Sequence, residues 1–264
     1  MNDIPATMRG TGIGAPVRRV EDKRFLRGQG RYVDDLAGAD TAQLVMLRSP
    51  HASARITRLD VSKARSMPGV LLVLTPEDIE ELGVLRCITP RLQRNGSPLA
   101  QTPWRMLAMG QVRYVGDAVA AVIAISRAAA QDAAEAIIVE YETLPAVTDV
   151  AEAIKPEAPR LWPDLAPENE SVLFRLGDAA AVEAAFARAA HVTRFDFRIT
   201  RVSANPMEPR NALASYDPVE ERYTLTTGTQ LPHVMRNEIA EYALKIPSNR
   251  LRIISPDVGG GFGM

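Results

Sequence analysis

The sequence ends in a glycine-rich stretch, PDVGGGFGM, whose residues Gly260, Gly261, Phe262 and Gly263 are candidates for binding an anion. A glycine turn after a strand exposes backbone N–H groups with no side chain in the way, which suits phosphate or another anion. The stretch matches neither G-x-G-x-x-G nor G-x-x-x-x-G-K-[ST], so a dinucleotide or P-loop site is disfavoured. Alone, such a run is more often a tight turn or a point of close packing. Both interpretations stay open.

A second candidate is Gln230, which begins a segment of helical pattern. At a helix start the positive end of the helix dipole and the amide donor can face one negatively charged oxygen. Gln230 could therefore bind an oxyanion or a metal-oxo group, or be an ordinary capping or solvent-facing glutamine. Glu208 and Arg210, in NPMEPRN, are close enough in sequence for a local ion pair, which is more often structural than catalytic.

Other catalytic and metal-binding patterns have little support. The histidines, His51, His191 and His233, show no H-x-x-x-H or H-E-x-x-H spacing, so the sequence predicts no zinc site. The single cysteine, Cys87, has no neighbouring histidine to activate it and cannot alone hold an iron-sulfur cluster. We predict neither a catalytic side chain nor a metal-ligating side chain on this chain.

Composition excludes several classes of partner. The 264 residues carry 31 Lys and Arg against 32 Asp and Glu, without a basic tract, so nucleic acid is not expected as a partner. No apolar run approaches the roughly 20 residues of a membrane span, and the N-terminus lacks the apolar core of a signal peptide. We expect a folded, cytoplasmic protein with no membrane contact.

The elements that must position the candidate residues begin with a mixed domain at 26–145. Residues 1–25 lack periodicity and are predicted to be an N-terminal arm that packs on a partner, while 86–104 has the character of a long loop. Expected strands lie at 42–48, 69–75 and 116–124, and expected helices, with Thr or Ser caps, at 75–82 and 126–137. This order of strands and helices favours a mixed α and β domain.

A proline-rich linker is predicted at 146–170, followed by a second domain at 171–264. The expected elements are strands at 172–177 and 191–199, a helix at 178–189 capped by Asp178, a β pair at 210–217 and 222–229, a helix at 230–246 with Thr229 as a possible cap and Pro232 in its first turn, and a strand at 250–255. The last strand leads directly into the glycine-rich stretch.

Several motifs, in this order, resemble one family. They are GAPVRRVEDKRFLRGQGRYVDDL, LRSPHASARI, VGDAVAAVIA, ANPMEPRNALASYDP, TGTQLPH and SPDVGGGFGM. Together they resemble the molybdenum-binding large subunit of the xanthine dehydrogenase and aldehyde oxidase family, particularly the branch with aerobic carbon monoxide dehydrogenase. The resemblance implies an α+β fold: an α/β hammerhead domain at 26–145, then the first part of a molybdopterin-binding domain at 171–264.

The resemblance also implies a chemistry. Such enzymes hold molybdenum on molybdopterin, here expected in the cytosine dinucleotide form, and transfer oxygen from water to an aldehyde, an N-heterocycle or CO. Electrons would pass to 2Fe-2S and FAD cofactors on a separate iron-sulfur subunit and FAD subunit. By resemblance, Gln230 would hydrogen-bond an oxo ligand of molybdenum, and Gly260, Gly261, Phe262 and Gly263 would lie against the metal centre and the pterin.

Large subunits of this family continue for several hundred residues past the GGGFG loop. There the resemblance places the glutamate general base, most cofactor contacts and the substrate pocket. We therefore expect an N-terminal portion that is inactive alone, either a fragment or one part of a split subunit whose second chain supplies the rest. Two alternatives remain: a non-catalytic assembly or interaction module with a hammerhead fold, and an anion- or nucleotide-binding domain unrelated to molybdenum.

Overall fold

The computed structural model describes residues 13–15, 18–88, 92–93, 96–174, 176–200 and 202–263. The strands are β1 (Gln43–Arg48), β2 (Ala54–Asp60), β3 (Val70–Leu74), β4 (Gln111–Val112), β5 (Ala118–Ala124), β6 (Ile138–Thr143), β7 (Ala212–Asp217), β8 (Arg222–Thr227) and β9 (Leu251–Ile254). The α-helices are α1 (Asp22–Phe25), α2 (Ser62–Arg65), α3 (Arg127–Glu135), α4 (Val150–Ala153), α5 (Ala179–Arg188) and α6 (Pro232–Asn237). The 3-10 helices are η2 (Val33–Leu36), η3 (Glu77–Ile79) and η5 (Ser248–Arg250), and η4 (Glu238–Leu244) is a π-helix.

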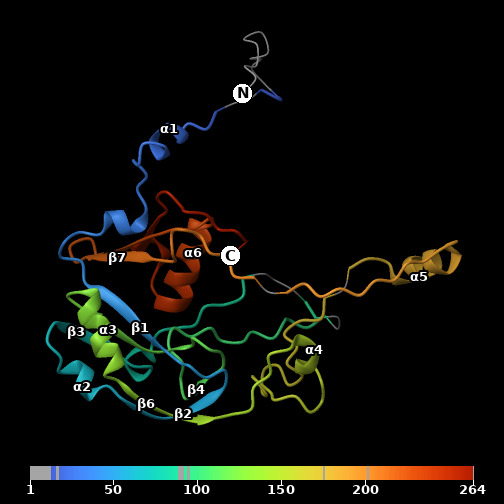
Figure 1. Ribbon diagram of the computed structural model, residues 1–264, viewed down its shortest axis with the longest axis horizontal. Coiled ribbons are helices and arrows are strands. Elements are labelled where there is room, and N and C mark those ends of the chain that lie inside the picture. The colour runs from blue at the N-terminus through green and yellow to red at the C-terminus, as the bar shows by residue number, and fades with distance from the viewer. Residues whose placement is uncertain are drawn as a thin grey trace.

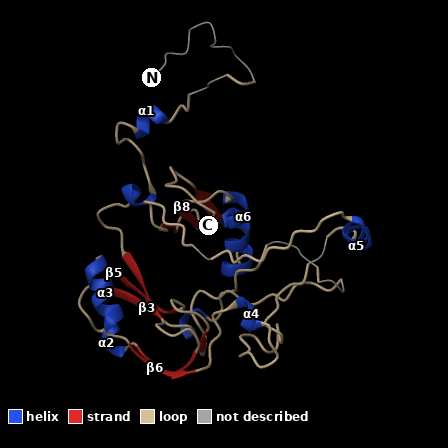
Figure 2. Cartoon of the chain, turned by 45° about the vertical axis from the view of Figure 1, so that its right-hand side comes forward, coloured by secondary structure: helices blue, strands red, loops and turns tan. Residues whose placement is uncertain are grey.

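The first unit, β1 to β6, contains two antiparallel sheets of order β1-β5-β3 and β4-β2-β6. Six of the seven residues of β5 are buried, in keeping with its sequence AVAAVIA. The small side chains of Ala130, Ala133 and Ala134 let α3 approach this sheet closely, and Figure 2 shows the helix beside β3 and β5. Ser126 caps α3 by accepting a hydrogen bond from the Ala129 N–H. The strands predicted at 42–48, 69–75 and 116–124 and the helix predicted at 126–137 are confirmed.

The helix predicted at 75–82 is wrong, because only the 3-10 turn η3 forms. The Asp78 carboxylate accepts hydrogen bonds from the N–H and the hydroxyl of Thr75 and pairs with Arg65, so a local cap satisfies the turn. The chain then leaves the helical path, since the Gly83 N–H donates to the Ala243 carbonyl 2.7 Å away in the second unit.

The second unit, β7 to β9, is one sheet of order β7-β8-β9. The predicted β pair forms β7 and β8, while β9 lies parallel to β8 after a crossover through α6 and η4. Pro232 takes the first helical position of α6, and the Thr229 hydroxyl accepts a hydrogen bond from the Leu231 N–H. Small sheets combined with helices make the whole fold α+β, as predicted.

Two of the predicted strands are absent from the described residues of 172–177 and 191–199. The alternating side chains of the second segment, Phe195, Phe197 and Ile199, are 71–83% exposed, because no described strand pairs with them. Helix α5 forms with its predicted Asp178 cap, yet all its residues are exposed and it stands far from the three sheets (Figure 1). Local caps and propensity alone account for this helix.

The region predicted as a linker, 146–170, contains helix α4 and a packed loop around Asn169. The Asn169 amide donates to the carbonyls of Ala153 and Pro159, and its oxygen accepts from the Leu161 N–H. These three hydrogen bonds hold the ends of the loop together. Across the described ranges, no helix combines the length and apolar character needed to cross a bilayer.

The two units are joined through residues 81–86, which contact η4. A Cβ atom on Gly83 would lie 1.7 Å from the Tyr242 carbonyl oxygen, so only glycine fits there. The Arg86 guanidinium lies 3.2 Å from the centre of the Tyr242 ring and pairs with Glu238 at 2.8 Å. Lys245, at the end of η4, donates to the Glu81 carbonyl at 2.6 Å. The first unit therefore contacts the helical connection that follows Gln230.

Candidate functional site

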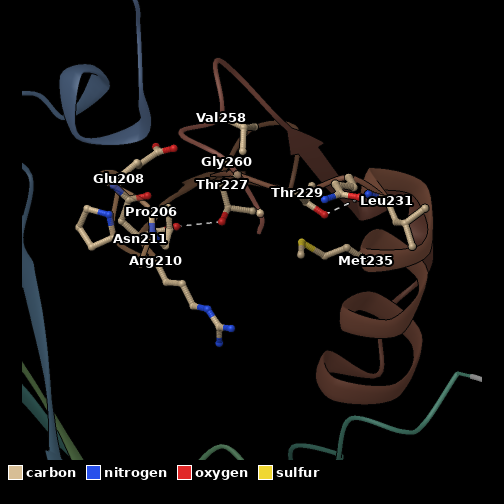
Figure 3. A pocket seen from close by; sticks show the side chains of 14 residues that line it. Pro206, Glu208, Arg210, Asn211, Thr227, Thr229, Leu231, Met235, Val258 and Gly260 are labelled. Carbon is tan, nitrogen blue, oxygen red and sulfur yellow. Dashed lines mark hydrogen bonds between the residues drawn. The ribbon is translucent and has the colours of Figure 1, made fainter. Parts of the chain in front are cut away.

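The glycine-rich stretch, the start of α6 and the segment before β7 surround a cavity of about 510 Å³ (Figure 3). It is lined by Pro206, Glu208, Pro209, Arg210, Asn211, Thr227, Gly228, Thr229, Gln230, Leu231, Met235, Val258, Gly260 and Gly261. Of the five candidate residues predicted from the sequence, Gln230, Gly260 and Gly261 line this cavity. Phe262 and Gly263 follow in the same loop and do not line it.

Gln230 and Gly261 approach each other closely although they are distant in sequence. A Cβ atom on Gly261 would lie 2.8 Å from Gln230 Nε2, so glycine allows this backbone to lie against the amide. Gln230 immediately precedes Leu231, the N-cap residue of α6. The helix therefore begins two residues after the predicted start at Gln230, and Gln230 lies in the cavity lining just before it.

The glycine loop itself is tightly curled. Gly260 has a φ of +111° and Phe262 a φ of +49°, both in the left-handed half of the map. The Phe262 ring folds back over Gly260, where a Cβ atom would lie 2.5 Å from a ring carbon. The loop therefore combines close packing with exposed backbone groups, so the two interpretations drawn from its sequence are compatible.

Glu208 anchors the loop from the opposite wall. Its carboxylate accepts a hydrogen bond from the Gly259 N–H at 2.6 Å and another from the Val33 N–H at 3.4 Å. The Arg210 side chain points away from Glu208 (Figure 3), so the ion pair predicted between them is wrong. The carboxylate is engaged by backbone donors from two distant segments instead.

The segment after residue 21 packs on this same loop. Arg24 forms a two-pronged ion pair with Asp257, and the Arg31 N–H donates to the same carboxylate at 2.7 Å. The hydrogen bond from Arg24 is the main reason why the pKa of Asp257 falls to about 2. The sequence predicted an arm, 1–25, that packs on a partner, whereas Arg24 near the end of that arm pairs with Asp257 in this chain's own glycine-rich stretch.

Asn211 is a site residue that the sequence analysis missed. Its side-chain Nδ2 atom is buried in the cavity wall and has no hydrogen-bond partner in the described ranges. Its backbone carbonyl accepts a hydrogen bond from the Thr227 hydroxyl at 2.8 Å. A buried donor without a partner is rare in folded proteins, so its position indicates where an acceptor on a ligand would lie. Its place in the motif ANPMEPRN was the only signal.

The histidines and the cysteine do not gather at this cavity. His51 packs edge-on against Tyr141 in the first unit, and the His191 ring contacts the Thr193 hydroxyl at 3.1 Å. Cys87 is exposed on the loop that leads away from residues 81–86. Within the ranges that the structure describes, no group of three or more His, Cys, Asp or Glu side chains is arranged to hold a metal ion.

Comparison with known proteins identifies both units. Residues 27–145 match the family described as aldehyde oxidase and xanthine dehydrogenase, a/b hammerhead domain, and residues 164–264 match the molybdopterin cofactor-binding domain. A hammerhead domain followed by a molybdopterin cofactor-binding domain places the chain in the class of molybdopterin-dependent oxidoreductases. The chain belongs to the xanthine dehydrogenase and aldehyde oxidase family and corresponds to the N-terminal portion of its molybdenum-binding large subunit.

Individual relatives agree with this assignment. The chain is 36% identical to the carbon monoxide dehydrogenase large chain of Afipia carboxidovorans and 39% identical to the nicotine 6-hydroxylase large subunit of Paenarthrobacter nicotinovorans, with 96% and 95% of this chain covered. The crystal structure of quinoline 2-oxidoreductase from Pseudomonas putida 86 matches with a TM-score of 0.79 and 40% identity over 94% of this chain. The chain spans only 30–31% of the length of these relatives.

Proposed function

We propose that this chain supplies one wall of the cofactor site in a molybdenum hydroxylase large subunit. The observation that carries the proposal is the convergence of the Gln230 amide and the Gly261 backbone in one cavity. The buried Asn211 amide adds a donor that lacks a partner in the described ranges. Such a set of donors fits a ligand rich in oxygen and negative charge. We assign residues 1–25 to an arm, 26–145 to the hammerhead domain, 146–170 to a linker and 171–264 to the cofactor domain.

Each residue has a role toward that ligand. Gln230 would donate its amide N–H to an oxo ligand of molybdenum. Gly260, Gly261, Phe262 and Gly263 would present their backbone to the metal centre and the pterin, with no side chain between them at the glycines. Glu208 and Asp257 touch backbone and Arg24, so they hold the loop in place. When bound, the molybdenum-molybdopterin group would supply the redox chemistry that places a water-derived oxygen on the substrate.

The activity proposed for the complete enzyme follows from its relatives. Their names include carbon monoxide dehydrogenase, nicotine 6-hydroxylase, quinoline 2-oxidoreductase and aldehyde oxidoreductase, so we propose a small molecule as the substrate class: an aldehyde, an N-heterocycle or CO. We further propose the cytosine dinucleotide form of the cofactor and a cytoplasmic location. Electrons would pass to 2Fe-2S and FAD groups on separate partner subunits. A second chain would supply the rest of the molybdenum domain if the subunit is split.

The test is coexpression with the iron-sulfur subunit, the FAD subunit and the remainder of the large subunit, followed by measurement of molybdenum in the purified complex. We expect the purified complex to contain molybdenum. The Gln230→Ala variant of the complex should turn over substrate roughly tenfold to a hundredfold more slowly. Gln131→Ala is the matched control, because Gln131 is an exposed residue of α3 whose amide hydrogen-bonds the Glu135 carboxylate and which does not line the cavity. A metal-free complex would support a non-catalytic assembly module instead. Equal turnover of the two variants in a complex that contains molybdenum would count against the contact assigned to Gln230.

A further inference from the structure

A second cavity, of about 590 Å³, lies beside the first unit and shares no lining residue with the candidate cofactor site. Its volume is in the range of ordinary small-molecule sites. Trp104 and Trp162, the only tryptophans in the chain, both line it, together with Arg105 and Arg113. Aromatic rings and guanidinium groups that line the same cavity can recognise a ligand that has both a planar ring and a negative charge.

Arg113 is held in a fixed position within this wall. Its guanidinium carbon lies 3.7 Å from the centre of the Trp162 ring. Its Nε donates to the Leu161 carbonyl at 3.0 Å and its Nη1 to the Gln111 carbonyl at 3.4 Å. The remaining nitrogen, Nη2, has no hydrogen-bond partner in the described part of the chain. Stacking and two backbone acceptors therefore orient the group while one donor nitrogen stays available.

The charges around the cavity leave an excess of positive charge. Arg86 is already paired with Glu238, so the groups that matter are Arg105, Arg113 and the carboxylate of Asp117. Asp117 accepts a hydrogen bond from the backbone N–H of Arg113 at 3.1 Å, so that carboxylate has a partner of its own. Burial lowers the pKa of Arg113, the charge of Asp117 raises it, and the nearby charge of Arg105 lowers it. A bound anion would offset the repulsion between the two guanidinium groups.

Trp104 gives the cavity its apolar side. The residue is 69% exposed, although its backbone is held in place where the Leu85 N–H donates to the Trp104 carbonyl at 3.1 Å. A large aromatic side chain left open beside a cavity offers a flat surface on which another ring can stack. The ligand should therefore carry a planar ring as well as a negative charge.

We propose that this cavity binds a small aromatic carboxylate, with the carboxylate at Arg113 and the ring against Trp104. A guanidinium fork matches the planar geometry of a carboxylate, and charge-assisted hydrogen bonds of this kind are stronger than neutral ones. Inorganic phosphate would leave the tryptophan surface uncovered, and an uncharged ring would leave the arginine without an acceptor. The proposal does not depend on molybdenum binding elsewhere in the chain.

The test is a fluorescence titration of the 264-residue chain with benzoate at constant ionic strength. Because both tryptophans line the cavity, a ligand that binds there should change the tryptophan emission. We expect a saturable change with a Kd on the order of 1 mM. Benzamide, which lacks the charge, and cyclohexanecarboxylate, which lacks the planar ring, should each bind at least roughly fivefold more weakly.

Variants separate the arginine from the tryptophan. Arg113→Met should weaken benzoate binding roughly tenfold or more, while Arg127→Met, on α3 and remote from the cavity lining, should bind as the parent chain does. Trp104→Ala changes an exposed side chain. It should weaken the binding of benzoate and should not strengthen the binding of cyclohexanecarboxylate.

Cys87 provides a second measurement, because the single cysteine also lines the cavity. Benzoate should slow alkylation of Cys87 at the concentrations that change the fluorescence. The proposal is overturned if benzoate changes neither signal, or if Arg113→Met binds benzoate as tightly as Arg127→Met while circular dichroism shows both variants folded.

Discussion

Replacing Gly83 by alanine tests how the two units are joined. A Cβ atom at this position would lie 1.7 Å from the Tyr242 carbonyl oxygen and 2.9 Å from its carbon, so the two backbones must separate. Gly83 does not adopt a left-handed conformation, and alanine can therefore take its dihedral angles without strain. The variant isolates the steric effect at the contact between residues 81–86 and η4.

The expected loss of stability has two parts. Overpacking costs about 1–3 kcal/mol, and separation of the backbones also breaks the hydrogen bond from Gly83 to Ala243, which contributes about 1 kcal/mol. A total near 3 kcal/mol corresponds to a fall in Tm of about 6–12 °C for a chain of this size. If the units then unfold independently, scanning calorimetry should show one transition splitting into two.

The control for this variant is Gly38→Ala. The nearest atom to a Cβ at Gly38 is the Thr41 hydroxyl, 3.7 Å away, which is an ordinary contact. Its stability should change by no more than about 0.5 kcal/mol. Only Gly83→Ala places a methyl group in steric conflict with a backbone carbonyl, that of Tyr242. Identical melting curves for the two variants would therefore refute the geometry described for the junction.

Two further predictions concern Asp257 and Asn169. Because the folded-state pKa of Asp257 is lowered to about 2, its ion pair with Arg24 should persist above pH 4 and be lost as the pH falls towards 2. A carbon-13 NMR titration of the carboxyl should show that low midpoint, and Arg24→Met should raise it; a midpoint near 3.8 in the parent chain would contradict the ion pair. Asn169→Ala removes three hydrogen bonds that close the 153–169 loop, so we expect about 2 kcal/mol of local destabilisation and faster proteolytic cleavage there. An unchanged cleavage rate would mean that other contacts close this loop.

Elements governed by local chemistry were predictable from the sequence. Ser126 and Asp178 each stand before a run of helix-forming residues, and both accept the expected capping hydrogen bond. The continuous apolar run of β5 predicted a buried strand in the same direct way. Strands β2 and β6 were missed because their charged residues hide the alternation. In the fold those charges pair across the strands, as Arg55 does with Glu142.

Features that depend on distant segments were not predictable. The pattern at 191–199 is typical of a strand, but a strand requires a partner, and the described residues supply none. Gly83 carried no signal, since the carbonyl that excludes a side chain there belongs to Tyr242. At the candidate site, the sequence indicates Gln230 and Gly261 by unrelated patterns, a helix start and a glycine-rich turn. Only the fold shows that the two residues approach each other. Asn211 was overlooked because its lack of a partner is a property of the folded cavity wall.

The π-helical turn η4 determines how much variation in chain length the connection between β8 and β9 can accept. Bonding from i to i+5 holds one more residue in each turn than an α-helix does. In a regular α-helix one additional residue would rotate the following side chains by about 100°. The wider turn of η4 accommodates that residue without such a rotation, so Tyr242 and Lys245 face Arg86 and Glu81. The extra residue in this connection is therefore compatible with the contact to the first unit.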